Sequence, residues 1–203
     1  MMRSTARVAV IGLALGLVAP TLQAQPPGYY GPPPARQQAE GPAAILSEGI
    51  GKVTAFLSQG GSRDPDAVEA FVRSEVAPYF DFAYMARFVA GPRYRYMSAE
   101  ERKQMEKALV GMFLGAMAEK LSGYPYGHVR YLPQRRDPRS GEVVLGIQAY
   151  QPNGLMTQLD FRLYRSPQGW KVFDVKANGQ SALVYYRQYF SRSAQRQGRP
   201  QRY

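Results

Sequence analysis

The sequence predicts an α+β protein, in which a helical N-terminal part packs on a strongly twisted antiparallel sheet of about four strands and a C-terminal helix follows. Two observations lead to this prediction. Apolar residues recur at helical spacing over residues 43–123, and they alternate with polar residues over much of residues 126–193. Short turn sequences separate the alternating segments, so consecutive strands are expected to pair as hairpins. Helices followed by hairpin strands are typical of α+β folds.

The N-terminal residues 1–24 have the pattern of a cleavable signal peptide. Arg3 and Arg7 precede the apolar run Val8–Ala19, and Pro20 ends that run. The run is too short to cross a hydrocarbon core of about 30 Å, so a membrane anchor is disfavoured. We therefore expect export, with the mature protein located in the periplasm.

Composition marks the two ends of the mature chain. Residues 25–42 are rich in proline and glycine, which predicts a disordered linker. Residues 194–203 carry arginines without an apolar pattern, which predicts a basic disordered tail. A single domain over residues 43–193 remains, and we expect it to be a monomer.

Composition also limits the chemistry. The chain has no cysteine, one histidine and a formal net charge of +11. Thiolate catalysis and cysteine-ligated metals are excluded, and one histidine leaves little room for a catalytic triad. We expect no metal and no cofactor. The basic charge favours anionic partners, but export makes nucleic acid an improbable one.

Capping residues divide the first half into helices. Leu46, Ile50, Val53 and Leu57 share one helical face, and Gly60-Gly61 ends that helix. The next helices are expected to begin at Asp64-Pro65, at Asp81 and at the capping box Ser98–Glu101, and the longest ends near Ser122-Gly123. Pro78 is expected to break the second helix and Gly91-Pro92 the third.

In the second half of the chain, apolar and polar residues alternate with a period of two. Strands are expected at residues 128–132, 143–149, 155–163 and 170–175, with turns at Asp137–Gly141, Pro152–Gly154 and Ser166–Gly169. A final helix is expected from Ser181 through Phe190.

Two groups of motifs resemble one family. The first comprises Pro78–Phe82, Met85-Ala86-Arg87, Gly91 and Ser98–Arg102. The second comprises Trp170–Val175, Gly179, Ser181–Leu183 and Tyr186–Phe190. In this order they resemble the MlaC/toluene-tolerance family of periplasmic phospholipid-binding proteins, over residues 45–192. The chain departs from that pattern at Ala90, Pro92, Tyr94 and Gln180, and these departures bear on which lipid is carried.

The resemblance implies an NTF2-like fold and a non-enzymatic carrier that shuttles phospholipid between the outer and inner membranes, maintaining outer-membrane lipid asymmetry. It also implies transient docking to an inner-membrane ABC lipid-transport complex and to an outer-membrane lipoprotein–porin complex. A related branch of the family is associated with hopanoids, so a hopanoid or another lipid remains an alternative ligand.

We expect an apolar cavity between sheet and helices to hold the acyl chains. The expected lining residues are Met85, Phe88, Met105, Leu109, Met112, Phe113, Val143, Leu145, Ile147, Leu159, Phe161 and Leu163. Methionines could adapt such a lining to different chains. Arg93, Arg95 and Arg130 are weaker candidates for contacting a headgroup or a docking partner.

An enzyme on an NTF2-like fold is the alternative to a carrier. A carboxylate in an apolar pocket can act as a base, and Asp160 and Asp174 lie on expected strands. A structural role as hydrogen-bond acceptor is the simpler interpretation of Asp174.

Overall fold

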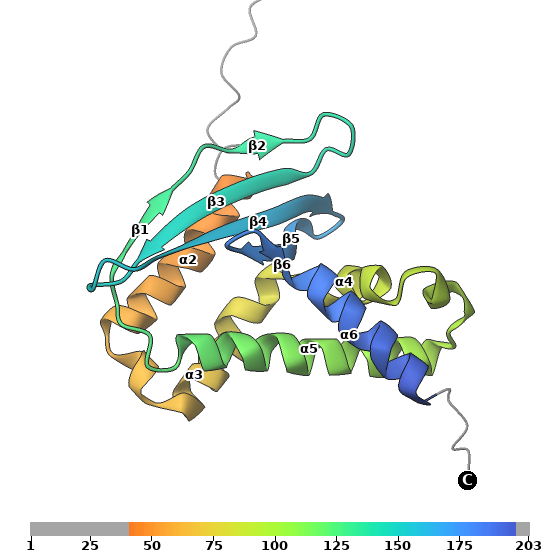
Figure 1. The fold of residues 1–203 in the computed structure, drawn as a ribbon. Helices are drawn as coiled ribbons and strands as arrows, with labels where there is room; N and C mark the ends of the chain where they lie inside the picture. Colours follow the sequence, from red (N-terminus) through yellow and green to blue (C-terminus); the bar gives the residue numbers. More distant parts are fainter. Residues whose placement is uncertain (1–40, 198–203) are drawn as a thin grey trace, which may run out of the picture. The chain divides into compact units, whose positions relative to one another are not determined.

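The computed structural model describes residues 41–197, which are drawn in colour in Figure 1. The predicted signal peptide, residues 1–24, lies outside the described residues, as does the predicted linker up to residue 40. No helix within residues 41–197 is long and apolar enough to cross a membrane.

Helices form the first half of the described chain and its C-terminal end. The α-helices are α2 (Pro42–Ser58), α3 (Pro65–Phe71), α4 (Phe82–Ala90), α5 (Ala99–Leu121) and α6 (Ala182–Gln197). The shorter turns are η1 (Gly61–Arg63), η2 (Val72–Val76), η3 (Ala77–Tyr79) and η4 (Gly91–Tyr96), of which η2 is π-helical and the others are 3₁₀.

The predicted caps are present at three helix starts. Asp64 accepts a hydrogen bond from the Asp66 amide, and Asp81 accepts one from the Tyr84 amide. At the start of α5, Ser98 and Glu101 form the reciprocal capping box.

The strands form one antiparallel sheet. Its members are β1 (His128–Tyr131), β2 (Arg135–Arg136), β3 (Val143–Tyr150), β4 (Met156–Ser166), β5 (Gly169–Ala177) and β6 (Gln180–Ser181). The strand order is β1-β3-β4-β5-β6, and β2 also pairs with β3. The α+β class is therefore confirmed. The expected count of four was too low, because strands of two residues, such as β2 and β6, carry no alternation to detect.

Three predicted boundaries need correction. Helix α2 already begins at Pro42, inside the predicted linker, because proline is favoured in the first helical turn. Helix α6 runs to Gln197, past the predicted start of the tail at residue 194. The second helix loses α-helical geometry after Phe71, before Pro78, and continues as η2 and η3.

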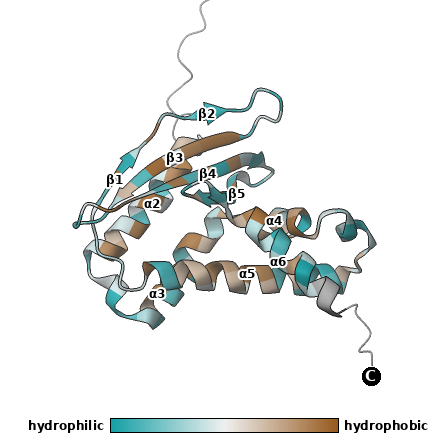
Figure 2. Cartoon of the chain, in the orientation of Figure 1, coloured by the Kyte–Doolittle hydropathy of each residue, from teal (hydrophilic) through white to brown (hydrophobic). Residues whose placement is uncertain are grey.

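The register of β3 and β4 separates two faces of the sheet. On the inner face, Val143, Leu145 and Ile147 of β3 lie opposite Leu163, Phe161 and Leu159 of β4, respectively. On the outer face, Val144, Gly146 and Gln148 lie opposite Arg162, Asp160 and Gln158. Figure 2 shows β3 as hydrophobic over much of its length, in contrast to the hydrophilic β2.

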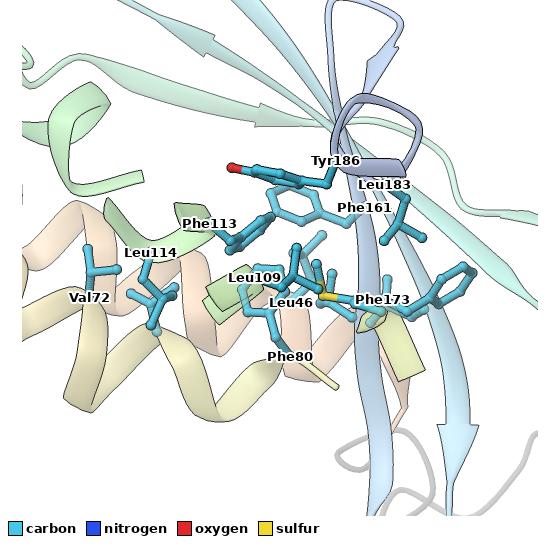
Figure 3. Close-up of a cluster of buried hydrophobic side chains, with 14 of the residues drawn as sticks. Leu46, Val72, Phe80, Leu109, Phe113, Leu114, Phe161, Phe173, Leu183 and Tyr186 are labelled. Carbon is cyan, nitrogen blue, oxygen red and sulfur yellow. The ribbon is translucent and has the colours of Figure 1, made fainter. Parts of the chain in front are cut away.

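One contiguous hydrophobic cluster joins the sheet to the helices. Helix α2 packs against β3 and β5, α4 packs against α5 and α6, and α6 packs against β5. Figure 3 shows Leu46, Leu109 and Phe113 of the helices converging with Phe161 of β4 and Tyr186 of α6. The aromatic rings of Phe80 and Phe113 meet edge to face, with centroids 5.0 Å apart.

Candidate functional site

All twelve residues predicted to line an apolar cavity belong to this one cluster. Eight of them are buried: Met85, Leu109, Phe113, Val143, Leu145, Ile147, Phe161 and Leu163. The other four are partly buried and pack against these: Phe88, Met105, Met112 and Leu159. In the conformation seen here, the side chains that were expected to surround a ligand contact one another.

The cluster reaches the surface at a cleft of about 560 Å³. One wall consists of α2 and the η2–η3 segment and contributes Ile45, Glu48, Lys52, Ser74, Glu75, Pro78 and Tyr79. The other wall is the β4–β5 hairpin and contributes Arg165, Gln168, Gly169, Trp170 and Lys171. We call these the helix wall and the hairpin wall.

A polar network orders the helix wall. Lys52 Nζ donates to Glu75 Oε2 at 2.9 Å and lies 4.0 Å from Glu48 Oε1, while the Tyr79 hydroxyl donates to Glu48 at 2.7 Å. The hydrogen bond to Glu75 raises the pKa of Lys52, and burial raises the pKa of Tyr79. Both groups therefore stay protonated at neutral pH.

A second, smaller cleft of about 290 Å³ lies between the start of α2 and the edge of the sheet. Its lining is Ala43, Leu46, Ser47, Tyr131, Leu132, Gln134, Leu145 and Gly146. Leu145 is the only one of the twelve predicted residues that lines either cleft.

The three predicted headgroup arginines lie elsewhere. Arg93 and Arg95 are exposed on η4, and Arg130 is exposed on β1. None of them lines either cleft. The cations at the larger cleft are Lys52, Arg165 and Lys171, which the sequence did not single out, because residues far apart in the chain meet there only after folding.

The two candidate catalytic aspartates are both engaged by protein groups. Asp160 accepts hydrogen bonds from Arg135 at 3.2 Å and from Gln158 at 3.3 Å. Asp174 is fully buried and accepts from the Ser181 hydroxyl at 2.8 Å and from the Leu183 amide at 3.2 Å. Asp174 therefore fixes the start of α6 to β5.

Arg162 supports Asp174 from the neighbouring strand. Its guanidinium lies 3.5 Å from Asp174 Oδ2, 2.8 Å from Glu142 Oε2 and 4.7 Å from the centre of the Phe173 ring. A β-bulge between Arg162 and Leu163 sets two residues of β5 against one of β4 here. No group of acidic or histidine side chains within residues 41–197 could hold a metal ion.

The sheet thus has one apolar face that the helices close into a single hydrophobic layer, and its buried carboxylate, Asp174, has a structural role. The family model described as "MlaC protein" matches residues 48–201. The chain thus belongs to the MlaC family, whose members are transport proteins and not enzymes.

Two relatives illustrate the similarity. The intermembrane phospholipid transport system binding protein MlaC of Haemophilus influenzae is 22% identical over 148 residues, which cover 70% of this chain and 69% of that protein. A phospholipid-binding protein of Ralstonia solanacearum, solved in complex with a phospholipid, aligns with a TM-score of 0.69 at 23% identity. The alignment covers 76% of this chain and 88% of that chain, and it confirms the fold.

Proposed function

We propose that this chain is a periplasmic phospholipid carrier that holds the acyl chains between the inner face of the sheet and the helices. The observation on which the proposal depends is the single apolar layer that joins Val143, Leu145 and Ile147 to Leu109 and Phe113. A relative of the same fold was solved with a phospholipid, which supports this choice of ligand.

The energetics of lipid transfer favour such an interior over a surface site. Burying a methylene group is worth about 0.8 kcal/mol, so two chains of roughly 16 carbons represent a gross cost on the order of 25 kcal/mol in water. A surface ion pair contributes about 0–1 kcal/mol. Only an extended apolar interior can offset the cost of carrying both chains through water.

Because the layer is closed in this conformation, binding requires the side chains to separate. Met85, Met105 and Met112 contribute flexible, polarisable side chains to the layer, and these can contact protein or lipid at similar cost. Lipid would therefore replace protein contacts within the same layer.

We further propose that the carrier shuttles phospholipid between the outer and inner membranes. The name of the Haemophilus relative, an intermembrane transport system binding protein, supports this role. It would receive or deliver lipid at an outer-membrane lipoprotein–porin complex and at an inner-membrane ABC complex, after export directed by residues 1–24. The chain has a formal net charge of +11, of which Arg3 and Arg7 of residues 1–24 contribute two; the basic charge that remains after export would assist transient docking to anionic surfaces.

The direct test is mass spectrometry of the protein purified from the periplasm of a Gram-negative host without detergent. We expect phospholipid to co-purify in amounts comparable to the protein. Hopanoid in place of phospholipid would change the ligand, and a protein free of any lipid would contradict the proposal.

A matched pair of variants separates binding from folding. Leu159→Gln places an amide on the inner face at a partly buried position and should reduce retained lipid several-fold. Val144→Gln places the same amide at a partly buried position on the outer face and should leave retained lipid unchanged. Equal lipid contents in two folded variants would argue against the inner face as the binding surface.

A further inference from the structure

We infer that the larger cleft receives a zwitterionic headgroup, in which a phosphate is joined to a primary amine, as in phosphatidylethanolamine. The inference rests on the proposed function, because it assigns an orientation and a headgroup class to the lipid held in the apolar layer. It begins with the position of the cleft relative to that layer.

The cleft lies at the end of the inner face. Leu163 pairs with Val172, and both are buried, while the next pair along the same face is Arg165 with Trp170. The apolar surface thus changes to a charged and aromatic one within two residues of each strand. A lipid whose chains lie against Leu163 and Val172 would place its headgroup beside Arg165 and Trp170.

The opposite side of the cleft is attached to β5 by main-chain contacts at Val172 and by the hydrogen bond from Lys171 to the Pro78 carbonyl. Phe80 forms a bridge with Val172, and the Asp81 amide donates to the Val172 carbonyl at 2.9 Å. The π-helical turn Val72–Val76 and the 3₁₀ turn Ala77–Tyr79 lead into this contact. Short turns of non-α geometry can shift more readily than long helices, so this segment is where the cleft and the layer can become continuous.

The two walls carry opposite charge. The helix wall has two carboxylates, Glu48 and Glu75, and one ammonium, that of Lys52. The hairpin wall has two cations, Arg165 and Lys171, and no acid. Opposite charges on facing walls suit a ligand that itself carries both signs.

The walls do not neutralise each other directly. No ion pair within residues 41–197 joins them, and neither Arg165 nor Lys171 takes part in one. The Lys171 ammonium instead donates to the Pro78 carbonyl at 2.7 Å. Both cations are therefore available to a phosphate that enters the cleft.

The carboxylates decide between headgroups. A phosphate can approach Arg165 and Lys171 whether or not the lipid has an amine. An ammonium extended across the cleft would reach Glu48 and Glu75 beside the ring of Trp170, which attracts cations, while the Tyr79 ring already has the Lys52 ammonium 5.6 Å from its centroid. An anionic headgroup such as phosphatidylglycerol meets only one cation on the helix wall, Lys52, and is repelled by the net negative charge that the two carboxylates give this wall.

Orientation can be measured with the protein's own fluorescence. Trp170 is the only tryptophan in the chain, so its emission reports on the cleft alone. Delipidated protein is titrated with phosphatidylethanolamine brominated either near the headgroup end of the acyl chains or near their methyl end. We expect the first lipid to quench Trp170 more strongly. Equal or stronger quenching by the second would overturn the inference and leave the proposed carrier intact.

Selectivity is tested by competition between phosphatidylethanolamine and phosphatidylglycerol. The double variant Glu48→Gln/Glu75→Gln retains hydrogen-bond acceptors but removes both charges, and both side chains are about half exposed. We expect its preference for the ethanolamine lipid to fall about fivefold, the upper range for exposed ion pairs. An unchanged preference would contradict the role of the helix wall.

The phosphate is tested by a charge reversal with a matched control. Arg165→Glu should weaken the binding of both lipids several-fold, because both carry the phosphate. Arg139→Glu makes the same change at an exposed turn away from the cleft and should leave binding unchanged. Equal affinities for the two variants would overturn the assignment.

Soluble glycerophosphoethanolamine should compete poorly with the lipid, because the acyl chains supply most of the affinity. Effective competition would identify a site for the free headgroup instead. Absence of lipid binding by the unmodified protein would contradict the proposed function itself.

Discussion

On the inner face of the sheet, β3 and β4 meet through three apolar pairs, whereas on the outer face β4 presents two charged groups and an amide, those of Asp160, Arg162 and Gln158. The inner contacts are non-directional, so a hydrocarbon chain can replace a side chain there without leaving a polar group unpaired. The outer contacts are directional, and Arg162, Asp160 and Asp174 each have defined partners. The outer face can therefore hold the register of the strands while the inner face exchanges partners.

The largest expected effect comes from the outer face. Asp174→Ala removes the buried carboxylate that accepts from Ser181 and Leu183, and it leaves the Arg162 guanidinium without one of its two acidic partners. We expect a loss of about 3–5 kcal/mol in the free energy of unfolding, measured by urea denaturation. Lipid should not restore this loss. A loss below about 1 kcal/mol would show that the outer-face contacts do not hold the sheet.

The inner face should respond differently to a comparable deletion. Leu163→Ala creates a cavity at a fully buried position and should cost about 3 kcal/mol in lipid-free protein. In lipid-loaded protein the deficit should be smaller, because an acyl chain can occupy the cavity. Urea denaturation of both forms gives the comparison, and an identical deficit in each would argue that lipid does not contact this face.

Tyr164 links the sheet to the start of α4, because its hydroxyl donates a hydrogen bond to Asp81. Tyr164→Phe should cost about 1–2 kcal/mol in the free energy of unfolding. Burial and the Asp81 carboxylate raise the pKa of Tyr164 to about 12, from 10.0. The folded protein thus retains this proton more strongly than the unfolded chain, so the stabilisation is complete below pH 10 and is lost as pH rises toward 12.

The same variant therefore has a second measurable signature. The unmodified protein should lose stability between pH 10 and pH 12 more steeply than Tyr164→Phe, as followed by thermal denaturation over that range. If the stability of the unmodified protein and of Tyr164→Phe fell in parallel over this pH range, Tyr164 would be excluded as the source of the loss of stability at alkaline pH.

The smallest expected effect lies at the exposed margin of the outer face. Arg135 bonds Asp160 at 3.2 Å, but its side chain is 66% exposed. Arg135→Ala should therefore cost less than about 1 kcal/mol in the free energy of unfolding, and the difference should shrink as salt is added. A larger loss in the free energy of unfolding that does not depend on salt would show that the Arg135–Asp160 pair stabilises the fold as the buried contacts of Asp174 do.

Local chemistry in the sequence was sufficient for most of the elements. The caps at Asp64, Asp81 and Ser98 act through neighbouring amides, so their effect can be inferred without knowledge of the fold. Alternation along β3 and β4 likewise specified the six inner-face residues, because successive side chains of a strand point to opposite faces. The short strands β2 and β6 depend on pairing with a longer neighbour, and no local pattern identifies them.

The sequence by itself therefore determined the class of fold, the three capped helix starts and the apolar faces of β3 and β4, because these follow from periodicity and from contacts within a few residues. Tertiary structure alone decided that the layer is closed in this conformation and that a charged cleft lies at its end. Glu48, Glu75 and Arg165 are distant in the chain and polar on local grounds. They become a possible site only because folding sets α2 and the η2–η3 segment against the β4–β5 hairpin.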